Sequence, residues 1–341
     1  MKVLIEAYNT YRQNSAGGVQ TRITNLLENF IKINSEDIEI TTFNKWNCKI
    51  DEYDLIHFFK SSIDHYNLMM FAKSKNISIV LSSITPIEGM MKIKILLLLS
   101  KYLKINTIHY IIWKNFDLAD IILAQTTKEK KFISSVYGIN QSKIRVLPNG
   151  IADVLLVGKK DDFRKKYNIQ GDFALMVGRV DSNKNQLGVI KALKHTDIQL
   201  VIIGGEDPED QTNYMERCLI EGKKNVKFIG WLDAKDPLLA SAYTDSKMVI
   251  LASHKEIYGN CIYEGLANNC YIAYSNVLEI EDEYLKEYIR SFDPNDLDDI
   301  YRCVEYFMHK ADDIKIDKYV REKYSWKAIA QEHLEIYREF K

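Results

Sequence analysis

The chain has 341 residues, and Gly plus Pro contribute only 20 of them, which excludes collagen-like and low-complexity classes. Its 46 Lys and Arg almost balance its 47 Asp and Glu, giving a formal net charge of -1. This total hides a split, because residues 1–150 hold 19 basic and 13 acidic residues (+6) and residues 151–341 hold the remaining 27 and 34 (-7). At about 150 residues per domain the length predicts two domains, and the split hints at different partners for them.

Secretion and membrane insertion are not expected. Lys2 and Glu6 interrupt any signal-peptide core, and the apolar run 95–99 is far shorter than the roughly 20 residues of a membrane span. The five cysteines are scattered and include no C-x-x-C pair, so free thiols in a reducing cytosol are the simplest interpretation. We therefore expect a cytoplasmic protein without disulfides.

The first 150 residues alternate short β-branched runs with longer amphipathic stretches. Strands are expected at 3–5, 38–43, 55–57, 77–81, 121–123 and 143–147, and helices at 18–30 and 63–72. This rhythm predicts a parallel sheet with helices on both faces.

After the turn residues Pro148-Asn149-Gly150 the rhythm restarts. Strands are expected at 173–177, 199–203, 226–229, 248–251 and 270–273, with helices at 183–193, 211–221, 235–243 and 260–268. The two series predict an α/β protein of two Rossmann-like domains, and the cleft between them is the expected active site. The predicted divisions are 1–155, 156–325 and a final helix over 326–341.

Gly17 and Gly18 follow the first strand and open the first helix. Backbone N–H groups at a helix N-terminus, unobstructed by Cβ atoms, form an anion site, although a plain turn is an equal alternative. The pair is not G-x-G-x-x-G, and a P-loop motif is absent, which disfavours NAD-binding and P-loop functions.

Arg179 and Lys184 lie five positions apart, just after the predicted strand 173–177. A guanidinium can grip a phosphate through two N–H groups, and an ammonium adds a point charge. A leaving diphosphate needs such charge as its bond breaks. A solvated basic turn is the alternative.

The segment 253–264, Ser-His-Lys-Glu-Ile-Tyr-Gly-Asn-Cys-Ile-Tyr-Glu, follows the predicted strand 248–251. Gly259 and Asn260 fall where a helix begins, with free N–H groups for a second phosphate. Placing the carboxylates of Glu256 and Glu264 near a phosphate costs free energy through charge repulsion, unless they bind hydroxyls. A ribose and a hexose supply such hydroxyls. A helix cap with a helical salt bridge is the alternative.

Together these motifs resemble the retaining glycosyltransferases of family four, which have the GT-B fold. The elements are G-R-x4-K at 178–184, S-x-x-E-x-x-G-x4-E at 253–264, the Gly-Gly loop and Leu-Pro-Asn-Gly-Ile at 147–151. Phe-Asp-Pro-Asn-Asp at 292–296 and Tyr-Ser-Trp at 324–326 resemble the family's C-terminal segments. The resemblance spans nearly the whole chain and implies that the last helix returns to the N-terminal domain.

The resemblance implies a role for each matching residue. Arg179 and Lys184 would hold the donor diphosphate, Glu264 the ribose hydroxyls and Glu256 the transferred sugar. The donor-binding residues implied as a set are Gly17, Gly18, Arg179, Lys184, Glu256, Tyr258, Gly259, Asn260 and Glu264. Arg179, Lys184 and Glu256 would be catalytic, the donor would be a nucleotide-diphosphate sugar, with a UDP-sugar favoured, and neither a metal nor a cofactor would be needed.

The chain departs from the family pattern in its first domain. Many members carry a His after the strand that is expected here at 77–81, whereas this chain has Ser82, Ser83 and Thr85 in that region. We therefore expect Ser83 and His57, which is predicted at the end of another strand, to be candidates for contact with the acceptor or the sugar. A structural role for His57 is the alternative.

A metal or nucleic-acid function is not expected. The only D-x-D triplet, Asp296-Leu297-Asp298, begins an acidic helix where capping explains it. The seven His show no ligand-like spacing, and the charge of +6 comes with no nucleic-acid recognition motif.

Residues 90–104, MMKIKILLLLSKYLK, predict a helix on the acceptor-side domain. Lys94, Lys101 and Lys104 fall within about 80° of one another on a helix, away from most of the Leu and Ile. Such a helix suits an anionic membrane surface carrying a lipid-linked sugar, and a core-facing helix with a basic edge is the alternative.

The expected function is transfer of a sugar from a nucleotide-diphosphate sugar to an acceptor hydroxyl, in surface polysaccharide or glycolipid assembly. The partners would be the nucleotide sugar and a saccharide or lipid-linked saccharide, with the protein in the cytoplasm or peripheral at the inner face of the membrane. A nucleotide-sugar 2-epimerase of the same fold and an inactive glycosyltransferase-like binding subunit are the alternatives.

Overall fold

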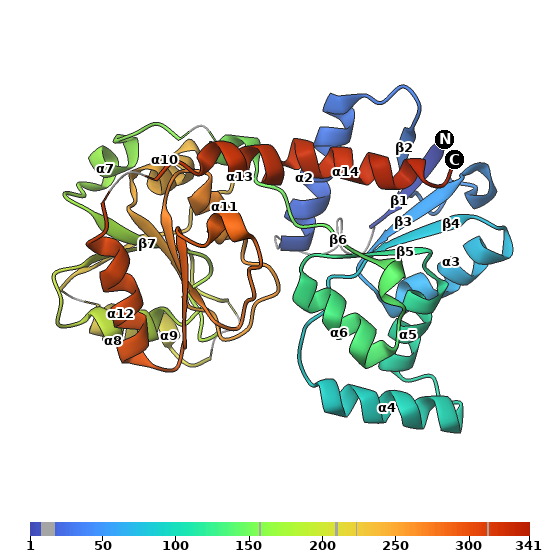
Figure 1. Cartoon of the computed structure of the whole chain (residues 1–341), viewed down its shortest axis with the longest axis horizontal. Helices are drawn as coiled ribbons and strands as arrows, with labels where there is room; N and C mark the ends of the chain where they lie inside the picture. The colour runs from blue at the N-terminus through green and yellow to red at the C-terminus, as the bar shows by residue number, and fades with distance from the viewer. Residues whose placement is uncertain (8–17, 157, 209–210, 223, 312–313) are drawn as a thin grey trace. The chain divides into compact units, whose positions relative to one another are not determined.

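The computed structural model describes residues 1–7, 18–156, 158–208, 211–222, 224–311 and 314–341 (Figure 1). The chain divides into two units, Met1–Gly150 with Trp326–Lys341, and Ile151–Ser325. The first stretch ends at Gly150, whereas the sequence predicted a boundary at 155. Each unit has its own parallel sheet and core and is described by itself.

The sheet of the first unit has the strand order β2-β1-β3-β4-β5-β6, and all of its pairs are parallel. Its strands are β1 (Lys2–Glu6), β2 (Glu39–Thr42), β3 (Leu55–Phe59), β4 (Ser78–Ser82), β5 (Ile121–Ala124) and β6 (Ile144–Val146). All residues of β3 and β5 are buried, as a parallel sheet covered on both faces requires.

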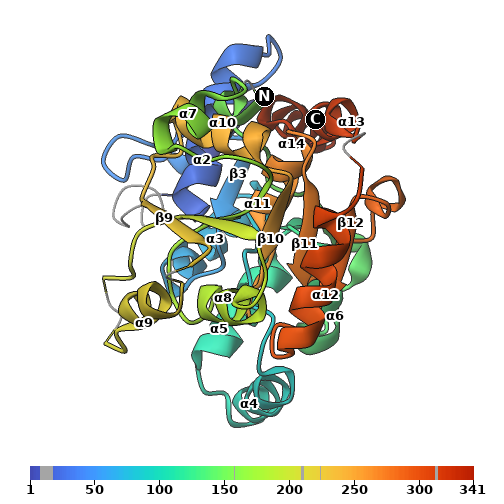
Figure 2. The ribbon, with the colours of Figure 1, turned by 90° about the vertical axis from the view of Figure 1, so that its left-hand side faces the viewer.

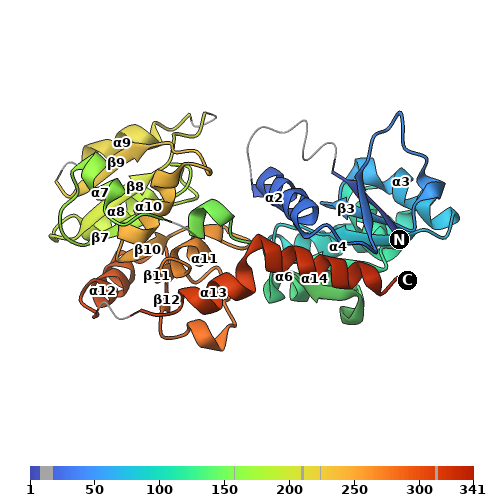
Figure 3. The same ribbon diagram turned by 90° about the horizontal axis from the view of Figure 1, so that it is seen from above.

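The helices of the first unit include one from the far end of the chain. They are α2 (Gly18–Ile33), α3 (Ile63–Ser74), α4 (Met90–Leu103), α5 (Ile108–Leu118), α6 (Thr127–Tyr137) and α14 (Trp326–Arg338). Helix α14 packs along α2, and the two chain ends lie near each other (Figures 1 and 3). It buries Trp326, Ile329, Leu334 and Tyr337, so a helix at the C-terminus completes the core of the N-terminal unit.

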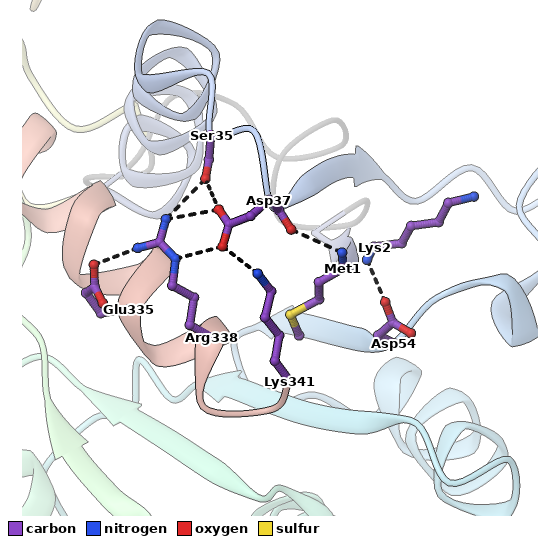
Figure 4. Close-up of polar contacts among 8 residues, drawn as sticks. All are labelled: Met1, Lys2, Ser35, Asp37, Asp54, Glu335, Arg338 and Lys341. Carbon is purple, nitrogen blue, oxygen red and sulfur yellow. Dashed lines mark hydrogen bonds and ion pairs between the residues drawn. The ribbon is translucent and has the colours of Figure 1, made fainter.

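Polar contacts fix the end of α14 to the turn before β2. The Asp37 carboxylate accepts hydrogen bonds from Arg338 (3.0 and 3.1 Å), Lys341 (2.5 Å) and Ser35 (2.6 Å), as Figure 4 shows. Hydrogen bonds from Arg338, then Lys341 and Ser35, hold the pKa of Asp37 well below its usual range. Arg145 also pairs with Glu339.

The sheet of the second unit has the strand order β12-β11-β10-β7-β8-β9, again all parallel. Its strands are β7 (Phe173–Val177), β8 (Gln199–Ile203), β9 (Val226–Gly230), β10 (Met248–Leu251), β11 (Tyr271–Ser275) and β12 (Ile289–Phe292). Its helices are α7 (Asp162–Tyr167), α8 (Gln186–Leu193), α9 (Tyr214–Glu221), α10 (Pro237–Asp245), α11 (Asn260–Leu266), α12 (Leu297–Met308) and α13 (Asp317–Tyr324). Helices α8 and α12 lie side by side (Figures 1 and 2).

The prediction of two Rossmann-like domains is confirmed by these two parallel sheets. Strand β12 was not predicted, because only Phe292 of its four residues is fully buried and Arg290 and Ser291 are exposed. The predicted acidic helix start is present, since Asp296 caps α12 by accepting from the N–H groups of Asp298 and Asp299.

Candidate functional site

The strand order of the second unit locates its ligand-binding edge. Strands β7 and β10 are neighbours, and the chain runs from β7 toward β8 on one side and from β10 toward β11 on the other. Ligands of open parallel sheets bind at such a switch point, outside the carboxyl ends of the strands. The loops after β7 and β10 carry Arg179, Lys184 and Glu256, so three of the predicted residues meet at this edge.

A close backbone approach shapes the loop after β7. A Cβ atom on Gly204 would lie 1.8 Å from the carbonyl oxygen of Gly178, so only glycine fits there. The chain then continues beside the end of β8, where the N–H of Val180 donates to the oxygen of Gly205 (2.8 Å). This approach fixes the direction in which the next residue, Arg179, leaves the sheet.

One carboxylate organises both predicted cations. Asp181 Oδ2 accepts from Arg179 Nε (2.8 Å), and its Oδ1 accepts from the backbone N–H of Lys184 (2.7 Å). The Asp181 side chain is 9% exposed, whereas that of Arg179 is 60% exposed and also faces Asp207 at 3.6 Å. Arg179 is therefore held at its Nε end, while most of its side chain remains open to solvent.

Lys184 and Glu256 join the two loops directly. Lys184 Nζ lies 2.6 Å from Glu256 Oε2, and the two side chains are 26% and 19% exposed. Burial opposes the charge on Lys184, but the attraction of the Glu256 carboxylate outweighs it and raises the pKa of Lys184. Lys184 therefore stays an ammonium at the switch point.

Hydrogen bonds between Asn183 and the backbone of the other loop hold the two loops in register. Its Oδ1 accepts from the N–H of Lys255 (2.9 Å), its Nδ2 donates to the oxygen of Lys255 (3.1 Å), and its carbonyl accepts from the N–H of His254 (2.8 Å). Because Asn183 joins the loops by three hydrogen bonds, the Lys184–Glu256 pair is not their only connection.

Glu264 lies on α11 at the same edge and is half-buried. Its Oε2 accepts a 2.5 Å hydrogen bond from the hydroxyl of Tyr243 on α10. Burial raises the pKa of Glu264, and the hydrogen bond from Tyr243 counteracts part of that effect. Tyr243 thus fixes one carboxylate oxygen of Glu264.

Cys261 lies among the charged residues. Burial raises the pKa of its thiol to about 12, and the charges of Lys184, Glu264 and Glu256 also act on it. One cation and two carboxylates, taken from two separate motifs of the sequence, therefore act on the same buried thiol.

Gly259 allows the turn into α11. Its φ is +75°, and a Cβ atom there would lie 2.6 Å from Leu251 Cδ2. Asn260 is the first residue of α11. The ring of Tyr258 is 5% exposed and stacks on Tyr263 at 4.6 Å, so its aromatic ring belongs to the core.

The predicted Gly-Gly loop is only partly described. Gly17 lies outside the described residues, and Gly18 is the first residue of α2. Their predicted role in phosphate binding stays a prediction.

The prediction of a ligand contact by His57 is corrected by the structure. Strand β3 continues to Phe59, so His57 lies inside it and is fully buried. Its Nδ1 is hydrogen-bonded to Tyr337 (2.6 Å) and its Nε2 to Ser82 (3.0 Å). Burial keeps its pKa well below the usual value, so the ring is a neutral core group.

The prediction for Ser83 is corrected for a similar reason. Ser83 is 1% exposed, and its hydroxyl lies within hydrogen-bond distance of the oxygen of Leu123 (3.1 Å) and of Glu129 Oε1 (2.7 Å). The buried Glu129 carboxylate also accepts from the N–H groups of Thr85 (2.6 Å) and Gln125 (2.7 Å). Ser83 is therefore part of a bridge between the loops after β4 and β5.

Sequence reasoning assigned no role to Asp181 or Tyr243. The sequence could have indicated Asp181, because an Asp commonly caps a turn by accepting from the backbone N–H three residues later. Tyr243 had none, since its partner Glu264 is 21 positions away on another helix. Among the described residues, no group of three His, Cys, Asp or Glu side chains is arranged to hold a metal ion.

A family model described as glycosyl transferases group 1 matches residues 159–325. This range covers both loops of the switch point and helix α11. The chain is also 28% identical, over 243 residues, to an uncharacterized glycosyltransferase of Methanocaldococcus jannaschii. That alignment covers 64% of this chain and 59% of the relative, so the chain spans about three fifths of the relative's length.

Solved structures share the fold over 99% of the chain. A sucrose-phosphate synthase from Thermosynechococcus elongatus has a TM-score of 0.73 at 17% identity, with 98% of that protein covered. The HepE protein of Anabaena, in complex with UDP and glucose, has a TM-score of 0.68 at 14% identity, with 100% covered. At these identities the likeness shows the GT-B fold of two Rossmann-like domains.

Proposed function

Since residues 159–325 match the family model of the glycosyl transferases group 1, we propose that the chain transfers a sugar from a nucleotide-diphosphate sugar to an acceptor hydroxyl. The observation that carries the proposal is the placement of Arg179, Lys184, Glu256 and Glu264 at the switch point of the second sheet. Two cations can bind the oxygens of a diphosphate, and two carboxylates can accept hydrogen bonds from the hydroxyls of a ribose and a hexose.

The donor diphosphate would bind between the two cations. The Arg179 side chain is 60% exposed, and its guanidinium would exchange the ion pair with Asp207 (3.6 Å) for hydrogen bonds to phosphate oxygens. Lys184 would exchange its contact with Glu256 for one with the phosphate, which frees Glu256 for the hydroxyls of the transferred sugar. The N–H groups at Gly259 and Asn260 would add donors to the phosphate.

The proposed reaction breaks the bond between the anomeric carbon and the phosphate oxygen, whose electron pair leaves with the diphosphate. Arg179 and Lys184 stabilise this growing charge. The acceptor oxygen attacks the same face of the sugar, so the anomeric configuration is retained, and its proton passes to the leaving phosphate oxygen. The charge is supplied by side chains, which accords with a reaction that needs no metal ion.

A UDP-sugar is the proposed donor. The Anabaena HepE structure contains UDP and glucose, and Glu264 offers one oxygen to a ribose while Tyr243 holds the other. The proposed acceptor is a saccharide or lipid-linked saccharide in surface polysaccharide or glycolipid assembly, on the cytoplasmic side of the membrane.

The test measures sugar transfer and release of nucleoside diphosphate across a panel of UDP- and GDP-sugars. Lys184→Ala and Glu256→Gln should lower kcat/KM by about 10²- to 10³-fold, the size expected when one charge-stabilising group is lost. Lys194→Ala is the matched control, because it removes a cation from the exposed Lys194–Glu221 pair of the same unit (2.8 Å). The rate should be unchanged by a metal chelator, and the product should keep the donor's anomeric configuration.

Other outcomes of this test would indicate one of the two alternative functions. Conversion of one nucleotide sugar into another without transfer would identify an epimerase, although His57 is occupied in the core and offers no support for it. Wild type and Glu256→Gln that are equally inert on every donor would identify a binding subunit.

A further inference from the structure

Helix α4 of the first unit exposes an unusual amount of apolar surface. It lies beyond α5 and α6 from the sheet, at the edge of its unit (Figures 1 and 2). Five apolar side chains point away from the unit, and we call them the apolar stripe: Met91 (72% exposed), Ile95 (52%), Leu98 (68%), Leu99 (50%) and Tyr102 (85%). At 100° per residue they fall within an arc of about 100° on one side of the helix.

The opposite side of α4 accounts for its packing. Ile93, Leu97 and Ser100 are buried and lie within an arc of about 60°, opposite the centre of the apolar stripe. The Ser100 hydroxyl is hydrogen-bonded to that of Thr107 (2.7 Å), just before α5. The helix is thus fixed to its unit by a narrow face, and the stripe is not needed for that attachment.

Positive charge flanks the stripe on both sides. Lys94 and Lys101 lie on one edge of the helix and Lys92 on the other, and Lys101 Nζ is 3.6 Å from the ring centroid of Trp113. Residues 89–116 contain five Lys and no Asp or Glu, which supplies most of the +6 of residues 1–150. An apolar face bordered by Lys, with aromatic residues beside it, is typical of a helix lying in a membrane interface.

We propose that α4 docks this unit onto an anionic lipid bilayer, with the apolar stripe entering the acyl boundary and the flanking lysines contacting headgroups. Charge complementarity selects this occupant, because a second copy of the chain would bring five more lysines to the same surface. Among the described residues, no single helix has the length and hydropathy to span a bilayer. Helices α4 and α5 taken together have that length and hydropathy, but the chain bends by 85° between them. The inference concerns binding alone and is independent of the donor site.

Vesicle flotation of the full chain tests the proposal. The vesicles are phosphatidylcholine alone or phosphatidylcholine with 30–50% phosphatidylglycerol, ranges chosen to span weak and strong surface potentials. Wild type should float with the anionic vesicles and lose binding as salt is raised. Leu98→Glu/Tyr102→Glu should lower the partition coefficient at least about 10-fold, since two charges would enter the acyl boundary.

A matched control and a charge variant separate the contributions. Ile31→Glu/Trp46→Glu replaces two apolar side chains of the same unit that are 78% and 89% exposed, and it should float as wild type does. Lys92→Gln/Lys94→Gln should weaken binding to anionic vesicles about 10-fold or more at low salt, with little change on neutral ones.

Three results would overturn the proposal. Wild type that stays with the unbound protein on anionic vesicles excludes membrane docking, and so does equal flotation of wild type and Leu98→Glu/Tyr102→Glu. Self-association of wild type in vesicle-free buffer, abolished by that same double variant, would assign the stripe to contact between copies of the chain. Each of these measurements is made without a donor substrate. The membrane proposal can therefore be tested even if the proposed transferase activity is not found.

Discussion

At the scale of single residues, the site consists of charged groups that already have partners. Asp181 holds Arg179 and the backbone of Lys184, while Glu256 holds the ammonium of Lys184. These partners hold Arg179 and Lys184 at the switch point before any diphosphate arrives, and Lys184 would then exchange Glu256 for the phosphate. We expect Asp181 to act by positioning the two cations.

Tyr243 gives a residue-scale prediction. Tyr243→Phe removes the hydroxyl that donates to Glu264 and leaves a half-buried carboxylate with one partner fewer, so the free energy of unfolding should fall by about 1–3 kcal/mol. The KM for the donor should rise, because Glu264 is no longer fixed in the position proposed for ribose binding. Chemical denaturation and donor kinetics measure the two effects. Tyr102→Phe, at an 85% exposed position, is the control, and equal behaviour of the two variants would contradict the role of Tyr243.

Gly259 gives a second residue-scale prediction. Gly259→Ala should destabilise the protein more than Gly171→Ala does, because the two glycines have similar φ values (+75° and +71°) but only Gly259 is enclosed. The left-handed conformation costs about 1–2 kcal/mol in either variant, and overpacking against Leu251 adds about 1–3 kcal/mol to the first. Denaturant unfolding curves give both values, and equal losses would mean that the packing around Gly259 yields without cost.

At the scale of elements, α14 and α4 differ in how they are attached. Helix α14 buries a broad apolar face and is held at its end by the Asp37 contacts, whereas α4 buries only Ile93, Leu97 and Ser100. The first pattern is that of a structural helix and the second that of a helix with a surface left for a partner.

The attachment of α14 predicts a pH dependence. The pKa of Asp37 is depressed below its ordinary value of 3.8, so its contribution to stability is fully present above that pH and is lost as the pH falls below it. Asp37→Asn should therefore be less stable than wild type at pH 7, and the difference should shrink as the pH falls below 4. Thermal unfolding of both proteins between pH 7 and pH 2.5 measures it.

A surface variant serves as the control for that experiment. Glu283→Gln removes one partner of an exposed pair with Lys286, and such pairs add little stability, so it should follow wild type at every pH. A difference between wild type and Asp37→Asn that is as large at pH 3 as at pH 7 would show that charge is not what Asp37 supplies.

At the scale of the whole molecule, the charge split persists when the chain is divided by structure. Residues 326–341 contain three basic and three acidic residues, so the first unit remains at +6 and the second at -7. The acidic second unit carries the proposed donor site, which makes the local cations Arg179 and Lys184 necessary for a diphosphate. The basic first unit carries α4.

The interleaved units predict an unequal response to truncation. Removing residues 326–341 uncovers the side chains beneath α14, including the Nδ1 of His57 that Tyr337 occupies. Each large side chain contributes about 1.5–3 kcal/mol by burial, so the loss rivals the whole stability of a domain. Hydrogen exchange should show β1 and β3 losing protection while β7 and β10 keep theirs. Tyr337→Phe should give a milder loss in the same strands, and unchanged protection of β1 in the truncated chain would contradict this role of α14.

The sequence by itself determined the two parallel sheets, since periodicity is a local property, and it identified Arg179, Lys184, Glu256 and Glu264, since each lies in a short motif. The tertiary structure alone decided how these groups pair, because Lys184 and Glu256 are 72 positions apart. It also decided that His57 and Ser83 are buried and hydrogen-bonded within the core, and that one side of α4 is exposed. The side chains that bury these residues and bond to them lie in segments distant in the chain, so no local sequence pattern can predict them.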